Sequence, residues 1–277
     1  MAAVTTRQAP VLPPPSGRAG FGGTLRSEFT KIRSVRSTYW TLLVLLVISV
    51  GIGAAICAGT AANWNQTSAA DRATFDATQV SIAGLFYLGQ LVIVVFGAIV
   101  LTAEYSTGMI RTSLTAMPRR VTVYAAKAVV FAIVALVVTL ISAFIAFFLG
   151  QALLASTHEN ATLSGHDVLR AVIGSALYVT LVGLFAFAAG AIFRHTAATI
   201  TSVIGLLFVI PILVQLLPHS WRDDIVRWLP DSAGGAISTT VGTQDHLFSP
   251  WGQFTVFAVY TAILLIVGGI LFRRRDA

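Results

Sequence analysis

Six apolar stretches, each long enough to cross a lipid bilayer, most constrain what this chain can fold into. A hydrocarbon core roughly 30 Å thick is crossed by about 20 apolar residues of helix. The stretches lack the alternating pattern of barrel strands, so we expect helices. Only 10% of the residues are charged, whereas a soluble domain carries about 25%. The sequence therefore predicts an all-α integral membrane protein with spans near Tyr39–Ala58, Val80–Ala103, Ala128–Leu149, Ala171–Phe193, Ala197–Leu217 and Phe254–Phe272.

The distribution of cations predicts how these spans are oriented. Fourteen of the 18 lysine and arginine residues lie on the side of the N-terminus, the second and fourth loops and the C-terminus. Because loops rich in lysine and arginine stay in the cytoplasm, we expect both termini to be cytoplasmic. The net charge of +7 reflects this asymmetry and contact with anionic lipid, and we do not expect nucleic-acid binding.

The N-terminal region divides into a tail and an amphipathic helix. Residues 1–20 are rich in Pro, Ala and Gly, which is typical of a disordered cytoplasmic tail, and 21–277 form a single six-span domain. Phe21 to Arg36 predicts a helix lying in the cytoplasmic interface. Its apolar arc holds Phe21, Leu25, Phe29, Ile32 and Val35, and its basic residues, mostly off that arc, are Arg26, Lys31, Arg33 and Arg36.

Glu28 breaks the pattern of this helix because it projects onto the apolar arc. One interpretation is a side chain near the helix start that snorkels or faces solvent. The other is a buried ion-pair partner for a basic residue elsewhere on the cytoplasmic side.

The stretch from Glu104 to Arg120, EYSTGMIRTSLTAMPRR, is the polar interruption between the second and third spans. Ser106 or Thr107 can cap a helix start, and Pro118 ends the helix at Met117. The resulting helix of about ten residues is too short to be stable alone in water. Its apolar stripe therefore docks either on its own protein or on a separate soluble partner; the stripe is Ile110, Leu114 and Met117.

Residues of the last outer segment, Pro211 and His195 are further candidates for a functional role. Pro218 to Pro250 is the longest outer segment, and it contains an amphipathic helix that Pro230 ends. The apolar side of this helix is formed by Trp221, Ile225, Trp228 and Leu229. Pro211 predicts a kink in the fifth span, either accommodated by neighbouring helices or bending the helix near the outer end of a pathway. We interpret His195 as an interfacial polar residue rather than a ligand.

Several kinds of chemistry are missing from the sequence. No GxxxxGK[ST] phosphate loop is present, so we expect no ATP binding by this chain alone. Cys57 is the only cysteine, and no His, Cys or carboxylate cluster has the spacing of a metal site, so we expect no bound metal. The apolar centres of the spans carry no Asp, Glu, Lys, Arg or His, whereas ion-coupled carriers usually need such intramembrane groups or broken helices. A transporter without such groups must take its energy from outside the bilayer.

Four segments carry a resemblance to a known family. SEFTKIRSVRSTYW, which enters the first span, resembles the start of permease subunits of type-2 ATP-binding-cassette (ABC) exporters. Glu104–Arg120 resembles the family's cytoplasmic loop between spans two and three, and Arg273–Arg275 fits its C-terminal end. The six-span layout is similar from Phe21 onward. PHSWRDDIVRWLPDSAGGAI, in the outer segment, is similar in layout to the family's re-entrant helices that cap the translocation path.

The resemblance implies a transport subunit, not an enzyme, in the bacterial cell membrane. It implies a separate ABC ATPase subunit that binds ATP and Mg, and a second permease copy, identical or different. The loop would couple to the ATPase; its candidate residues are Glu104, Gly108, Met109, Ile110, Arg111, Leu114, Pro118 and Arg119. Glu104 is placed to pair with Arg111 or Arg119. Trp221, Trp228 and Pro230 are candidates for an outer gate. The alternative function is a non-transporting anchor or regulator that recruits a soluble partner through the same loop.

Overall fold

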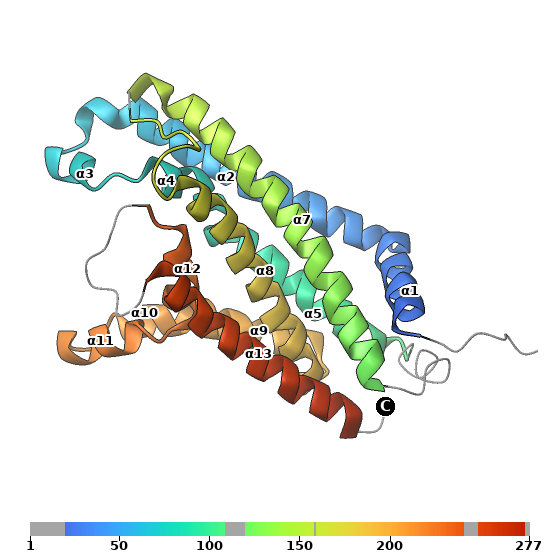
Figure 1. Ribbon diagram of the computed structural model, residues 1–277. Coiled ribbons are helices and arrows are strands. Elements are labelled where there is room, and N and C mark those ends of the chain that lie inside the picture. The colour runs from blue at the N-terminus through green and yellow to red at the C-terminus, as the bar shows by residue number, and fades with distance from the viewer. Residues whose placement is uncertain (1–19, 109–119, 158, 241–248, 275–277) are drawn as a thin grey trace, which may run out of the picture.

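The fold is a bundle of long helices (Figure 1), seen in a computed structural model that describes residues 20–108, 120–157, 159–240 and 249–274. No β-strand occurs in these ranges. Six of the described helical stretches are long and apolar enough to cross a membrane. They are Arg36–Gln66, Ala77–Ser106, Arg120–Thr157, Val168–Phe193, Thr196–Val214 and Pro250–Arg274. The predicted all-α, six-span fold is confirmed.

The spans are built from one to three elements each. The first is α2 (Arg36–Asn63) with η1 (Trp64–Gln66), and the second is α4 (Ala77–Gly84), η2 (Leu85–Gly89) and α5 (Gln90–Ser106). The third is α7 (Arg120–Leu154) with η3 (Ala155–Thr157), and the fourth is α8 (Val168–Phe193). The fifth is α9 (Thr196–Ile204), η4 (Gly205–Val209) and α10 (Ile210–Val214), and the sixth is α13 (Pro250–Arg274). Outside the spans lie α1 (Phe21–Ser34), α3 (Ala69–Ala73), α11 (His219–Val226), α12 (Pro230–Gly235) and η5 (Ala236–Ser238).

The third span begins well before the predicted Ala128. Helix α7 starts at Arg120 and continues without a break into the apolar stretch, because its first turns pack against α1. Lys127 therefore lies inside a helix and is buried, although the sequence placed it in a loop. Hydropathy marks where a helix meets the hydrocarbon, whereas packing decides how far the helix extends beyond it.

Helix α8 forms the centre of the bundle. In its most apolar window 72% of the residues are buried, against 17% for α13 at the periphery. It packs against α5, α7 and α13. A Cβ added at Gly97 of α5 would lie 2.2 Å from the carbonyl oxygen of Gly183 on α8. Only glycine allows the two backbones to approach this closely, so small residues set the spacing of the core helices.

The second and fifth spans are each interrupted by a π-helical turn, η2 and η4. Pro211 stands near the start of α10, immediately after η4. A proline within a helix removes one backbone hydrogen bond and crowds the carbonyl four residues earlier. A wider π turn at this point relieves the crowding, so the fifth span is interrupted where Pro211 predicted a kink.

The segment between the fifth and sixth spans folds differently from its prediction. Helix α11 ends at Val226, so Trp228 and Leu229 lie beyond it. Pro230 does not simply end a helix: it begins α12, a position where its missing N–H costs nothing. Helix α12 and η5 pack against α8 and α13, and Pro230, Ala233 and Gly234 are buried. This segment therefore enters the bundle instead of lying wholly on its surface.

The connections gather at the two ends of the bundle (Figure 1). Helix α1, the end of α5, the start of α7, the α8–α9 turn and the end of α13 lie at one end, and α3 and α11 lie at the other. The segments that the cation distribution assigns to one membrane face therefore share one end of the molecule. We call it the α1 end.

Candidate functional site

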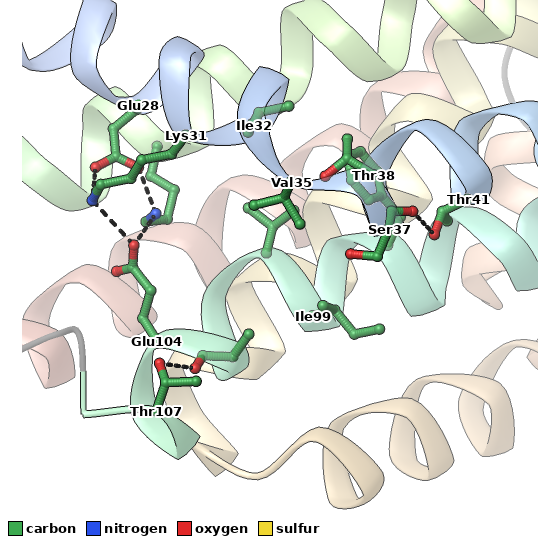
Figure 2. Close-up of a pocket in the computed structure, with 14 residues that line it drawn as sticks. Glu28, Lys31, Ile32, Val35, Ser37, Thr38, Thr41, Ile99, Glu104 and Thr107 are labelled. Carbon is green, nitrogen blue, oxygen red and sulfur yellow. Dashed lines mark hydrogen bonds and ion pairs between the residues drawn. The ribbon is translucent and has the colours of Figure 1, made fainter.

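A cluster of four charged side chains lies at the α1 end, between three helices (Figure 2). Glu28 and Lys31 come from α1, Glu104 from the end of α5 and Lys127 from α7. Lys127 Nζ lies 2.5 Å from Glu28 Oε2 and 2.8 Å from Glu104 Oε1. Lys31 Nζ lies 2.7 Å from Glu28 Oε1 and 3.2 Å from Glu104 Oε1. Each lysine thus bridges both carboxylates, and we call this group the charge cluster.

The charge cluster is buried and internally balanced. The side chains of Glu28 and Lys127 are 3% and 4% exposed, while Lys31 is 31% exposed at the edge. Burial alone would raise the pKa of Glu28, but the ammonium groups of Lys127 and Lys31 outweigh it and lower that pKa. Burial alone would likewise lower the pKa of Lys31, but Glu28 and Glu104 raise it. Both groups are therefore held in their charged forms.

The charge cluster lies next to the predicted coupling loop along the chain. Glu104 precedes residues 109–119 and Lys127 follows them, so the ion pair joins the two helices that flank this stretch. Glu28 adds α1, which leads into the first span through Val35. The second carboxylate oxygen of Glu104 is buried without a hydrogen-bond partner among the described residues. Three helices, α1, α5 and α7, thus meet at one ionic contact, and α1 leads on into the first span.

A cavity of about 290 Å³ opens beside the charge cluster. Figure 2 shows it between α1, the start of α2 and α5, with Glu28, Lys31 and Glu104 at one side. Its remaining surface is mostly apolar, formed in part by Ile32 and Ile99. The space leaves room between α1 and α5 that side chains do not fill, so these helices meet chiefly through the ion pairs.

Neighbouring contacts tie the end of α5 to two further segments. The guanidinium of Arg194, in the α8–α9 turn, lies 5.1 Å from the centre of the Tyr105 ring, a cation–π distance. Tyr105 also packs edge to face on Phe272 of α13. His195 Nδ1 accepts the Ala198 N–H and so caps α9, consistent with a structural role for this histidine.

The helix predicted from Phe21 to Arg36 is present in a shorter form. Helix α1 ends at Ser34, and Val35 is extended, so the helix stops two residues before the predicted end at Arg36. Phe29 is about half exposed, and Arg33 and Arg36 are exposed. Of the two interpretations of Glu28, the buried ion-pair partner is correct, and its distant partner is Lys127.

The predicted coupling helix falls largely outside the described residues. Of its candidate residues, Met109, Ile110, Arg111, Leu114, Pro118 and Arg119 lie there, so the pairing of Glu104 with Arg111 or Arg119 stays a prediction. The hydroxyls of Ser106 and Thr107 both donate to the Ala103 carbonyl at the end of α5. The helix that either residue was predicted to cap lies outside the described residues. Gly108 adopts a positive φ of 69°, the left-handed conformation that ends a helix.

Sequence reasoning missed Lys127. It immediately precedes Ala128, the predicted start of the third span, and so falls among the second-loop cations that predict the orientation. One signal was present: Lys31 and Lys127 are the only lysines among 18 basic residues, and both join the charge cluster. The compact ammonium of lysine carries three donors, so one lysine can contact two carboxylates at once.

The three residues proposed for an outer gate differ in burial. Trp221 and Trp228 are 67% and 52% exposed, whereas Pro230 is buried at the start of α12. The buried part of this region is therefore α12 and η5, which follow the two tryptophans.

The chain matches the model of a known protein family. The family model described as "ABC-2 family transporter protein" matches residues 24–215, more than half of the chain, from α1 to the end of the fifth span. A search of curated proteins found no match.

Proposed function

The chain belongs to the ABC-2 family of transporter proteins, and from this premise we propose that it is the permease subunit of an ATP-driven exporter. In this proposal it spans the bacterial cell membrane with both termini in the cytoplasm. A separate ABC ATPase subunit binds ATP and Mg, because the sequence has no phosphate loop of its own. A second permease copy completes the substrate path, since six spans enclose little central space.

The observation that carries the coupling part of this proposal is the charge cluster. Lys127 joins Glu104 and Glu28, so the two helices that flank residues 109–119 are fixed to each other and to α1. Buried ion pairs with short contacts resist separation, because parting them leaves charges without partners in a medium of low dielectric constant. A force applied to the loop would therefore move α5, α7 and α1 together.

The mechanism follows from this connection. An ATPase that closes on ATP would displace the helix between Gly108 and Met117, and the charge cluster would pass the displacement to the first three spans. Tyr105 would pass it to the α8–α9 turn and α13 through Arg194 and Phe272. The apolar cavity beside Ile99 leaves space for α1 and α5 to shift relative to each other.

Coupling is tested by Ile110→Asp, which places a charge on the predicted docking stripe outside the spans. The variant should insert and fold normally, whereas its co-purification with the ATPase subunit and ATP-driven transport should be lost. Leu114→Pro should act the same way, because a proline inside a helix costs about 3 kcal/mol or more. Undiminished ATPase binding and transport by Ile110→Asp would refute the proposal that this helix binds the ATPase. An anchor or regulator would instead bind its partner without moving any substrate.

Orientation is tested by single cysteines in a Cys57→Ala background. Residues placed outside by the cation distribution should react with an impermeant thiol reagent in intact cells, and residues placed inside should not. The outside positions are Thr67, Thr162 and Thr243, and the inside positions are Thr115 and Ala277. Strong labelling at Thr115 would contradict the proposed orientation.

A further inference from the structure

A second and larger cavity, of about 740 Å³, lies away from the charge cluster. The second span, the fifth span and the α12–η5 segment surround it. Its volume falls within the range of sites that hold a drug-sized molecule, about 300–1,000 Å³. We call it the α12 cavity.

Among the described residues, Asp231 is the carboxyl group that lines the α12 cavity. Asp231 lies in α12, outside the spans in sequence, yet its carboxylate accepts a hydrogen bond from Tyr178 of α8 at 3.0 Å. Tyr178 lies ten residues into the fourth span, which corresponds to roughly 15 Å of helix. Because α12 folds into the bundle, it carries Asp231 to the level of Tyr178, within the length of the fourth span. Ionisable groups at this depth mark substrate or ion pathways.

The partners of Asp231 leave it short of positive charge. None of the described basic residues forms an ion pair with it; the nearest in sequence, Arg227, pairs with Asp224. The Tyr178 hydroxyl lies within bonding distance of both Asp231 Oδ1 and Gln90 Oε1, but it has a single proton to donate. Burial raises the pKa of the Asp231 carboxyl, and the Tyr178 hydrogen bond lowers it only in part. The described residues around Asp231 therefore supply a hydrogen bond from Tyr178 but no cationic partner.

The remaining surface of the α12 cavity is suited to a cationic ligand that also has an apolar body. Phe86, Tyr87 and Phe208 line the cavity together with aliphatic side chains. Phe86 stacks on Tyr178 with ring centres 5.2 Å apart, so the aromatic wall continues to the residue that binds Asp231. Aromatic faces attract cations, most strongly where water is excluded.

We propose that the α12 cavity binds a monovalent organic cation with an apolar body. The charge lies at Asp231, and the body packs against Phe86, Tyr87 and Phe208. This inference rests on the proposed transport function, for which it names the class of substrate. The cavity is bordered by the two spans that contain π-helical turns, η2 and η4, so displacement of either span would change its shape.

The test measures binding of tetraphenylphosphonium to the full chain in lipid nanodiscs, without an ATPase, with empty nanodiscs subtracted. Wild type should bind this cation saturably. Asp231→Asn keeps the shape and the acceptor for Tyr178 but removes the charge, and should bind at least tenfold more weakly. The matched control is Asp224→Asn, whose carboxylate is 79% exposed on α11; it should bind as wild type does.

A second comparison does not depend on how the variant folds. Tetraphenylborate has nearly the same shape and the opposite charge, so it should bind wild type at least tenfold more weakly than the cation. Equal affinity for the two ions, absence of saturable cation binding, or unchanged binding by a folded Asp231→Asn would each overturn the proposal. Because no ATPase takes part, these outcomes are separate from the result for Ile110→Asp, which tests the proposed coupling.

Discussion

Replacing Lys127 with methionine gives the most direct test of the charge cluster. The substitution keeps most of the side-chain volume and removes the ammonium group that lies 2.5 Å from Glu28 and 2.8 Å from Glu104. Two buried carboxylates would then share Lys31 alone, which is 31% exposed and sits at the edge. We therefore expect a large loss of stability rather than a local rearrangement.

The magnitude follows from the burial of the pair. Removing one partner of a buried ion pair costs about 3–5 kcal/mol, because the other charge stays in a medium that solvates it poorly. Lys31 already contacts both carboxylates, so we expect the lower end, about 3 kcal/mol. For a chain of this size such a change corresponds to a fall of roughly 10 °C in the melting temperature.

The assay is thermal unfolding of the purified protein in detergent, followed by tryptophan fluorescence. Arg33→Met is the matched control, since it also removes a cation by the same replacement, but from an exposed position on α1. The double variant Glu28→Gln, Lys127→Met also removes one of the two carboxylates that lose Lys127 as a partner. It should be more stable than Lys127→Met alone. A melting temperature of Lys127→Met equal to that of Arg33→Met would refute the buried cluster. A double variant less stable than Lys127→Met would do the same.

The remaining predictions concern pH and helix packing. Because the folded-state pKa of Glu28 is lowered, its charge stabilises the fold above its ordinary pKa of 4.5 and loses this effect as pH falls through the lowered value. The gap in melting temperature between wild type and Glu28→Gln should therefore be full at pH 7 and close in acid; a gap independent of pH would contradict this. Gly84→Ala should destabilise the bundle, since its Cβ would lie 1.9 Å from the Ser49 carbonyl oxygen, whereas Gly51→Ala, with nothing within 4 Å, should be neutral in the same melting assay.

Hydropathy and short motifs determined the class of this protein. A bilayer of fixed thickness requires apolar helices of matching length, so the number of spans can be read from the sequence without knowing how they pack. The segments from α1 to the fifth span likewise carried the family resemblance, and the match over residues 24–215 confirms it. Pro211 also predicted the interruption of the fifth span at the right place. A proline lacks a backbone N–H and so removes a hydrogen bond within its own helix, whatever the helix packs against.

Tertiary structure alone decided which polar groups meet. Glu28 and Lys127 are 99 residues apart, and the pair forms only because α1 turns at Val35 and lies across α7. Residues 218–250 read as an outer loop, yet α12 enters the bundle and brings Asp231 to Tyr178. The apolar centres of the spans gave no sign of this carboxylate, because it belongs to none of them. Local sequence patterns fix the type and length of each helix, whereas the rotation and approach of helices depend on contacts between distant segments, such as Gly97 against Gly183.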